Sequence, residues 1–268
     1  MPELPEVETV ARQLAPLSVG RKARRLVVRD GKLAGAARRS LGGRRLESVF
    51  RLGKQVVFQF ENGVGERWLS VHLRMTGRLL WRAAGEPVPK SPAPRAELAF
   101  DGGAIDFVDP RRFGTMTWLA RLDEARPKGI DPTAPEFTIA ALGRLAAGSR
   151  QELKTFLLRQ DRLVGVGNIY ASEILNRARL DPRRVAGSLD EAELRRLHGA
   201  TRAVLAAAIR ACGTTFSDFQ DAHGLTGRYQ AKLRVYGREG EPCRRCGAPI
   251  VRFEQGGRST YFCPACAE

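Results

Sequence analysis

The sequence predicts an α+β protein with an N-terminal helix, an antiparallel β-sandwich and a helical C-terminal region that ends in a cysteine-rich hairpin. Three observations support this. Short runs of strand character recur up to residue 119, helical periodicity dominates from about residue 138 to 213, and two Cys-x-x-Cys pairs lie in the last thirty residues. A chain of 268 residues has room for two modest domains and a small extra module.

The N-terminal half predicts one helix followed by many short strands. Val7, Val10, Leu14 and Leu17 recur at helical spacing behind a proline-containing first turn. Apolar runs that are typical of strands then follow at 26–28, 55–60, 68–73, 79–81, 98–100, 105–108 and 115–119. Hairpin turns are predicted at Asn62-Gly63 and Asp101-Gly102-Gly103, and a proline-rich loop at 87–94. This spacing favours an antiparallel sandwich or barrel.

The C-terminal half is predicted to be helical. A proline-bearing stretch at 127–135 marks the domain boundary, and helices are expected at 139–145, 152–158, 169–178 and from a capping box at Ser188–Glu191 to Gly213. Residues 213–230, rich in glycine, threonine and polar groups, are predicted to form a flexible connection. We therefore expect domains at 1–126, 136–230 and 231–268.

Four of the five cysteines predict a metal site. Cys243, Cys246, Cys263 and Cys266 form a Cys-x2-Cys-x16-Cys-x2-Cys pattern, which fits one structural Zn²⁺ held by four thiolates with no open position for catalysis. Between the pairs, apolar runs flank Gly256-Gly257 and predict a β-hairpin with Arg258 beside its tip. The fifth cysteine, Cys212, continues an apolar helix face and is predicted to be a buried core thiol.

The charge balance predicts a polyanionic partner. The 45 lysines and arginines exceed the 29 acidic residues, which gives a net charge of +16 and a pI of about 10.6. Charge alone separates nucleic acid from an anionic membrane only weakly, but no apolar stretch reaches the length of a membrane span. The first ten residues carry three glutamates and no basic residue, so we expect a cytosolic protein without an export signal.

Pro2 is a candidate nucleophile, because removal of Met1 would leave its ring nitrogen as a free secondary amine. A terminal amine titrates near ~7.7–8.0, whereas a surface lysine titrates near ~10.4 and is almost wholly protonated at neutral pH. The adduct of a secondary amine with an aldehyde sugar is a cationic iminium, which favours elimination from the neighbouring carbons. The alternative interpretation is structural, since proline and carboxylates also suit the first turn of a helix.

Two loops that follow predicted strands combine basic and large apolar residues. The segments Asp109–Gly114 and His72–Gly77 place Arg111, Phe113 and Met75 at strand ends. Exposed Met and Phe side chains usually form minor hydrophobic patches, but in a protein that binds duplex DNA they can act as wedges that unstack a base step. Lys54 precedes another strand and is either chemically important or an ordinary surface lysine.

A glycine-containing junction lies between two predicted helices. Gly165-Val166-Gly167-Asn168 lacks the strand and the third glycine of a dinucleotide site. We expect instead a tight turn in which Asn168 caps the next helix and backbone N–H groups face a phosphate. Lys154, on the preceding helix, would add a positive charge.

Together these segments resemble the formamidopyrimidine-DNA glycosylase family, bacterial enzymes that excise oxidised purines such as 8-oxoguanine. The resemblance covers the whole chain and rests on an ordered set of segments: Pro2–Glu6, Asp109–Gly114, Gly165–Glu173, Gly213–Thr215, Val235–Arg238 and the cysteine hairpin. It implies a catalytic β-sandwich domain, a helix-two-turn-helix DNA-binding domain and a zinc finger with four cysteine ligands. It also implies a monomer of the bacterial cytosol or nucleoid, whose partner is double-stranded DNA with oxidised bases or abasic sites and not a membrane.

The resemblance further implies roles for individual residues. Pro2 would attack C1′ of the damaged nucleotide, and Glu3 would donate and shuttle protons. Lys54 would assist β-elimination, and Arg258 would hold phosphate and support δ-elimination. Met75, Arg111 and Phe113 would fill the emptied base stack, with Arg111 facing the orphaned cytosine, while Lys154 and Asn168 would contact phosphates.

The chain also departs from the family pattern. Relatives commonly carry a Lys-His-x-His run before the strand at Leu98, whereas residues 91–96 contain no histidine, and Arg95 is expected to substitute as a phosphate contact. Arg228-Tyr229 stands where an aromatic pair is frequent, so lesion preference could be shifted. Two rival hypotheses are an endonuclease VIII-like enzyme for oxidised pyrimidines, which Leu4 argues against, and a catalytically idle zinc-containing DNA-binding protein.

Overall fold

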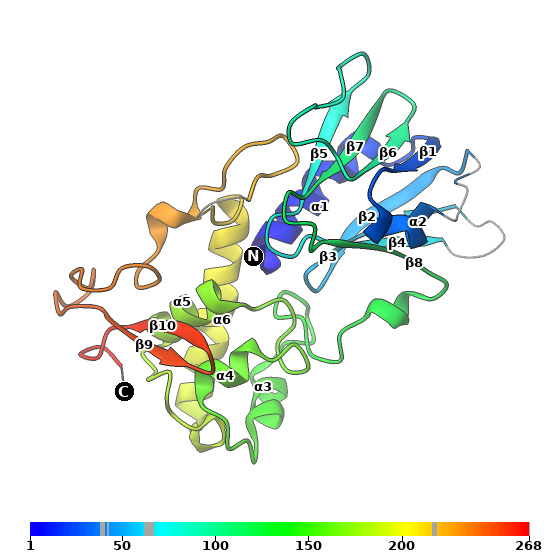
Figure 1. Cartoon of the computed structure of the whole chain (residues 1–268). Helices are drawn as coiled ribbons and strands as arrows, with labels where there is room; N and C mark the ends of the chain where they lie inside the picture. The colour runs from blue at the N-terminus through cyan, green and yellow to red at the C-terminus, as the bar shows by residue number, and fades with distance from the viewer. Residues whose placement is uncertain (38–40, 42, 62–66, 216–218, 268) are drawn as a thin grey trace. The chain divides into compact units, whose positions relative to one another are not determined.

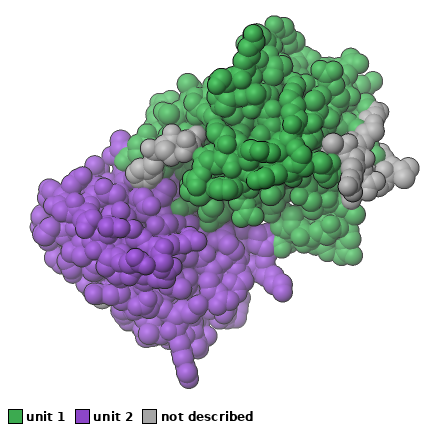
Figure 2. All heavy atoms as spheres, viewed as in Figure 1, with its two compact units in different colours: residues 1–126, 211–230 green, residues 127–210, 231–268 purple. Residues whose placement is uncertain are grey.

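The computed structural model describes residues 1–268 except 38–40, 42, 62–66, 216–218 and 268. The chain divides into two compact units (Figure 2): unit 1 comprises residues 1–126 and 211–230, and unit 2 comprises residues 127–210 and 231–268. Residues 211–230, which the sequence analysis groups with the helical domain, thus belong to unit 1. Phe219 and Ala222 bury their side chains in its core, and the Ala222 carbonyl accepts a hydrogen bond from Trp81 N at 2.9 Å.

In its described residues, unit 1 consists of one long helix and two four-stranded antiparallel sheets (Figure 1). Helix α1 spans Leu4–Ser18. One sheet has the order β1-β6-β7-β5, with strands Ala23–Val28, Ala96–Phe100, Gly103–Val108 and Arg78–Ala83. The other has the order β2-β3-β4-β8, with strands Leu46–Leu52, Gln55–Phe60, Trp68–His72 and Thr115–Leu119. Short helical segments lie at Gly31–Leu33, Ala34–Ala37 and Leu122–Ala125.

Both sheets and α1 contribute to one hydrophobic core. Val7, Val10 and Leu14 of α1 are fully buried and belong to the same cluster as side chains from both sheets, such as Phe58 and Phe107. Burial of each such side chain stabilises the fold by about 1.5–3 kcal/mol. The α+β class with antiparallel sheets, which the sequence predicts, is confirmed.

All seven strands predicted up to residue 119 are present, as β1 and β3 to β8. Strand β2 is not predicted by the sequence. The β2 sequence, Leu-Glu-Ser-Val-Phe-Arg-Leu, mixes charged and apolar residues without clean alternation, so its strand character comes from pairing with β3. The turn at Asp101-Gly102 is confirmed, with Gly102 at φ +86° and Phe100 paired with Gly103. The predicted turn at Asn62-Gly63 lies outside the described residues.

Unit 2 contains four helices and one hairpin in the part of the chain that the structure describes. The helices are α3 (Ile139–Ala146), α4 (Leu153–Leu158), α5 (Asn168–Ala178) and α6 (Glu191–Arg210), and the hairpin strands are β9 (Val251–Gln255) and β10 (Arg258–Phe262). Short 3₁₀ segments lie at Ala186–Ser188 and, across the unit boundary, at Tyr229–Lys232. Helix α5 packs on both α6 and β10. Within the described ranges, none of the helices combines the length and the apolar character that a membrane span requires.

The ends of α6 differ from the prediction. The capping box is formed by Asp190 and Glu193, whose side chains each accept a hydrogen bond from the other's backbone N–H, at 2.8 and 3.0 Å. Ser188 precedes it in a 3₁₀ turn. At the other end, Cys212 and Gly213 have φ values of +58° and +78°, so the helix stops at Arg210. Cys212 is half-buried beyond the helix end, and its predicted place on a buried helix face is wrong.

Candidate active site and metal centre

The predicted nucleophile and its neighbour lie at the buried start of α1. Pro2 is buried, and Glu3 is the N-cap residue of the helix. Glu3 and Glu6 form a reciprocal capping box in which Glu3 N donates to Glu6 Oε2 at 2.8 Å. This arrangement fixes the direction in which the chain enters the helix, and with it the place of residue 2.

Glu6 also anchors the helix start to the segment at Gly213. Its Oε1 atom accepts a hydrogen bond from Thr214 N at 2.7 Å, and the side chain is almost fully buried. Gly213 has φ +78°, and a Cβ atom there would lie 2.7 Å from Glu6 Oε1. Only glycine allows this approach. Sequence reasoning missed Glu6, although a glutamate three residues after the N-cap is the usual signal of such a capping box.

Lys54 lies beside a histidine that the sequence analysis did not single out. Gln55, the next residue, pairs with His72 across β3 and β4. Burial, with smaller effects from Arg74 and Lys54, lowers the pKa of His72 to about 4. The ring is therefore neutral at pH 7. Its Nδ1 atom accepts a hydrogen bond from Arg74 N at 3.0 Å, which assigns the proton to Nε2 and makes that atom a donor suited to an anion.

The structure brings Met75, Arg111 and Phe113 together, and we call these three residues the wedge cluster. Met75 is 45% exposed and Phe113 is 50% exposed. Arg111 Nη1 lies 3.6 Å from Met75 Sδ, and its guanidinium carbon lies 4.9 Å from the centroid of the Phe113 ring. Two loops that are far apart in sequence thus present one apolar and cationic surface.

Arg95 does not have the expected position. Its side chain is only 6% exposed and forms ion pairs with Asp30 at 2.6 Å and Asp109 at 2.8 Å. The expectation that Arg95 substitutes for the missing histidine as a phosphate contact is therefore wrong, because the side chain is buried and its Nε and Nη1 atoms donate to two buried carboxylates.

Lys154 and Asn168 both contact the hairpin in unit 2. Lys154 is fully buried, and its Nζ donates to Ser259 O and Thr260 Oγ1, both at 2.8 Å. Asn168 Nδ2 lies 3.0 Å from Ser259 O and 3.4 Å from Tyr236 Oη. The predicted capping role of Asn168 is wrong, because Gly167 is the N-cap and Asn168 is the first helical residue. Their phosphate contacts stay a prediction.

Glu173 is a buried residue whose role sequence reasoning missed. Its carboxylate accepts hydrogen bonds from the backbone N–H groups of Arg234, Val235 and Tyr236, at 2.9 to 3.1 Å. Burial raises the pKa of Glu173, and the three N–H donors partly oppose that effect. The contacts hold Tyr236, whose ring lies 5.0 Å from that of Tyr261 in β10.

The predicted hairpin and cysteine cluster are confirmed. Gln255 pairs with Arg258, and Gly256 and Gly257, at φ +57° and +72°, form the turn between them. Arg258 is exposed beside this turn. The four cysteine sulfurs, from two chain segments, lie within 4.8 Å of one another. Arg245 N also donates to Cys243 Sγ at 3.5 Å, as suits a thiolate ligand, so the residues fit a tetrahedral metal ion.

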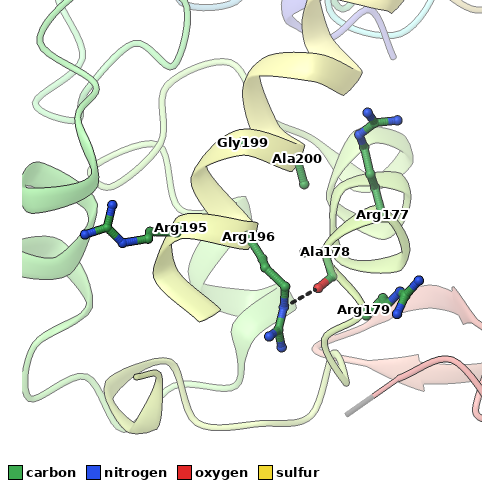
Figure 3. Close-up of a pocket in the computed structure, with 7 residues that line it drawn as sticks. All are labelled: Arg177, Ala178, Arg179, Arg195, Arg196, Gly199 and Ala200. Carbon is green, nitrogen blue, oxygen red and sulfur yellow. Dashed lines mark hydrogen bonds between the residues drawn. The ribbon is translucent and has the colours of Figure 1, made fainter. Parts of the chain in front are cut away.

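A groove of about 470 Å³ lies between α5 and α6 and is lined by four arginines, namely Arg177, Arg179, Arg195 and Arg196. Arg196 Nε donates to Ala178 O at 3.2 Å, which satisfies a carbonyl at the end of α5. The side chains of Arg177, Arg179 and Arg195 point in different directions (Figure 3). They add to the positive surface of unit 2 without converging on one ligand.

Comparisons with known proteins agree with this geometry. Three family models match: the formamidopyrimidine-DNA glycosylase N-terminal domain at residues 1–116, its H2TH domain at 129–220, and a zinc finger found in FPG and IleRS at 240–268. The formamidopyrimidine-DNA glycosylase of Heliobacterium modesticaldum is 41% identical over 278 residues, which cover 99% of each chain.

Solved structures show the same fold. The crystal structure of the MutM (Fpg) protein from Thermus thermophilus has a TM-score of 0.84 and 42% identity, covering 99% of this chain and 98% of the other. The Fpg of Lactococcus lactis, in a complex with DNA that contains an abasic site, has a TM-score of 0.87 and 31% identity, covering 99% of each chain. This chain belongs to the formamidopyrimidine-DNA glycosylase family.

Proposed function

We propose that this protein is a bifunctional DNA glycosylase and AP lyase of base-excision repair, which removes oxidised purines such as 8-oxoguanine and formamidopyrimidines from duplex DNA. The observation that supports this best is the anchored N-terminus. Glu3 and Glu6 fix the start of α1, and Glu6 ties it to Thr214, so an amine freed by removal of Met1 has a defined place. A purely structural helix start does not need this second anchor.

The proposed reaction uses the amine of Pro2 as nucleophile. Its nitrogen attacks C1′ and the bond from C1′ to the base breaks, with Glu3 giving its proton to the departing base. Glu3 then takes the N–H proton of Pro2 and passes it to the ring oxygen as the sugar opens. The product is an iminium ion between Pro2 and C1′. Loss of a C2′ proton then expels the 3′ phosphate by β-elimination, with Lys54 as a proton donor and DNA contact. A second elimination expels the 5′ phosphate, with Arg258 binding the phosphate charge, and leaves a one-nucleotide gap.

The wedge cluster supports the proposal that the damaged nucleotide leaves the helix before the reaction. A terminal amine cannot reach C1′ in an intact base stack, so the nucleotide must be extruded. We propose that Met75 and Phe113 occupy the emptied space and that Arg111 faces the orphaned cytosine. Positive charge elsewhere, together with the Nε2–H of His72, would bind phosphates through counterion release. Direct phosphate contacts by Lys154 and Asn168 require their present contacts with β10 to be exchanged.

We further propose that the metal is one Zn²⁺. Cys243, Cys246, Cys263 and Cys266 would hold it with all four tetrahedral positions filled, so the ion would supply cross-linking of the hairpin base and no chemistry at the substrate.

Substrate preference distinguishes the main alternatives. The Lactococcus lactis Fpg has been crystallised with DNA that contains Fapy-dG, and also with DNA that contains an oxidised pyrimidine. The second complex keeps an endonuclease VIII-like preference for oxidised pyrimidines as a rival hypothesis, whereas Leu4 favours oxidised purines. The second rival is an idle DNA-binding protein, against which the anchored Pro2 and Glu3 argue.

The test is an incision assay on three duplexes, which contain 8-oxoguanine opposite cytosine, an oxidised pyrimidine, or an abasic site. We expect fastest incision at 8-oxoguanine, with phosphates at both ends of the gap. Glu3→Gln should slow base excision by about 100-fold or more, whereas Glu8→Gln, on the same helix, should not. Fastest incision at the pyrimidine would support the first rival, and no incision of any duplex would contradict the proposed function.

A further inference from the structure

We propose that Arg95 is a positioning residue for the wedge cluster: through Asp109 and Asp30 it fixes the two loops that carry Met75, Arg111 and Phe113. The inference rests on the proposed function, because it assigns Arg95 to the step in which the nucleotide leaves the base stack. It concerns unit 1 alone.

The first link runs from Arg95 to the base of the loop 109–114. Arg95 Nη1 donates to Asp109 Oδ2 at 2.8 Å and to Gly114 O at 2.9 Å. Gly114 N donates to the same Asp109 oxygen at 2.7 Å. Both ends of the loop therefore meet at Arg95, and Arg111 and Phe113 lie between them. A Cβ atom on Gly114 would lie 2.6 Å from the Phe107 ring, so the loop end is also tightly packed.

The second link joins the loop of Met75 to the same carboxylate. Thr76 is buried next to Met75, and its Oγ1 donates to Asp109 Oδ1. The same hydroxyl accepts a hydrogen bond from Arg111 N at 3.3 Å. Asp109 thus touches both loops of the wedge cluster, and Arg95 supplies the positive charge that pairs with this buried carboxylate.

The third link holds Arg112, which lies between Arg111 and Phe113. Arg112 donates to both oxygens of Asp30, at 2.9 and 2.5 Å, and Arg95 Nε donates to Asp30 Oδ2 at 2.6 Å. Arg112 has φ +57°, a backbone conformation that is strained for a non-glycine residue, and its two hydrogen bonds to Asp30 help to hold it. Asp30 therefore holds the tip of the loop while Asp109 holds its base, and Arg95 connects the two carboxylates.

An arginine suits this position because its planar guanidinium presents donors in separate directions. Nε serves Asp30 and Nη1 serves Asp109, whereas a lysine ammonium is a single point charge. A wedge must stay rigid while it pushes against stacked bases. Loss of the connection should therefore reduce nucleotide extrusion more than it reduces reactions on a site that is already unstacked.

A matched control lies on the sheet of the same unit. Arg82 also bridges two buried carboxylates, with Nε at 2.7 Å from Asp106 and Nη2 at 2.8 Å from Glu97. In the described ranges its hydrogen bonds go to Asp106, Glu97 and Glu86 O, which lie outside the two wedge loops. Arg82→Met therefore measures what the loss of an arginine between two buried carboxylates does to the protein in general. Any further loss in Arg95→Met reports the connection to the wedge loops.

The experiment compares Arg95→Met, Arg95→Lys and Arg82→Met with wild type. Single-turnover excision of 8-oxoguanine opposite cytosine should be about 10- to 100-fold slower in Arg95→Met, with intermediate rates in Arg95→Lys. The preference for cytosine over adenine opposite the lesion should weaken, because Arg111 loses its fixed position. Cleavage of a duplex with a preformed abasic site should stay within about twofold of wild type.

Hydrogen exchange of the free protein gives a second readout that does not need activity. Arg95→Met should raise exchange in residues 73–77 and 109–114, and Arg82→Met should not. Unchanged exchange in these loops, or equal losses on all substrates in Arg95→Met and Arg82→Met, would overturn the inference. Failure of wild type to incise any duplex would instead count against the proposed function, while the exchange data still decide whether Arg95 positions the loops.

Discussion

The wedge cluster of unit 1 and the hairpin tip of unit 2 present exposed arginines in different ways. Arg111 lies on a loop held by buried ion pairs among Arg95, Asp30 and Asp109. Arg258 lies beside a hairpin turn whose strand β10 accepts hydrogen bonds from Lys154 and Asn168 and whose base carries the four cysteines. The first support consists of ion pairs between side chains, and the second of four cysteines and hydrogen bonds to uncharged acceptors of β10. The two regions should therefore fail under different conditions.

Metal removal should produce the largest difference between the two regions. Structural Zn²⁺ contributes about 10–16 kcal/mol of binding free energy in small zinc domains. A chelator, or Cys263→Ser, should therefore disorder the hairpin and abolish incision. All three tryptophans, Trp68, Trp81 and Trp118, lie in unit 1, whereas Tyr236 and Tyr261 lie in unit 2. Tryptophan emission should stay unchanged while the near-ultraviolet signal of Tyr236 and Tyr261 is lost. A parallel loss of both signals would contradict the conclusion that the wedge cluster and the hairpin tip are supported separately.

Removal of the buried ammonium should have the next largest effect. Lys154→Met keeps the length of the side chain but leaves Ser259 O and Thr260 Oγ1 without this donor. We expect a loss of about 1–3 kcal/mol in unfolding free energy, with raised hydrogen exchange in residues 251–262. Lys128→Met, at an exposed position of the same unit, is the control. Equal exchange in the two variants would show that Lys154 does not support the hairpin.

Acidification from pH 7 to pH 5 should destabilise unit 1, by a smaller amount than the changes above. The pKa of His72 is about 4 in the folded protein and near 6.5 when unfolded, so the unfolded state binds more protons between these values. Stability should therefore fall as pH decreases from 7 to 5, by about 1–2 kcal/mol from this group. The pKa of Asp30 is lowered, mainly by Arg112, so this group reduces the stability of the fold only below about pH 4.

Urea unfolding followed by tryptophan emission at pH 7 and pH 5 measures this effect. His72→Gln should flatten the pH dependence, because glutamine does not titrate. An identical pH dependence in His72→Gln and wild type would contradict the assignment.

Much of this architecture is predictable from the sequence, for identifiable reasons. The exposed wedge residues and the cysteine cluster can be predicted from residue type and spacing. A loop after a strand and a Cys-x-x-Cys pair are both recognisable from a few neighbouring residues. The hairpin turn likewise follows from Gly256-Gly257. Strand β2 could not be predicted, because its mixed pattern gains strand character only through pairing with β3.

The supporting residues are harder to predict because their partners are distant in sequence. Arg95 binds Asp30 across 65 positions, Glu6 binds Thr214 across 208, and Lys154 binds the hairpin across about 105. Arginine, glutamate and lysine are usually exposed, so no local pattern indicates their burial. Arg95 is accordingly expected at the DNA surface from the sequence, whereas the structure buries it.

The most direct test of the account is borohydride trapping on a duplex that contains 8-oxoguanine opposite cytosine, followed by peptide mapping of the covalent complex. We expect the reduced sugar on the peptide that begins at Pro2, and no complex with a variant that carries an uncleaved N-terminal extension. Attachment at Lys54 or another internal lysine, or trapping that survives the extension, would contradict the terminal amine as nucleophile.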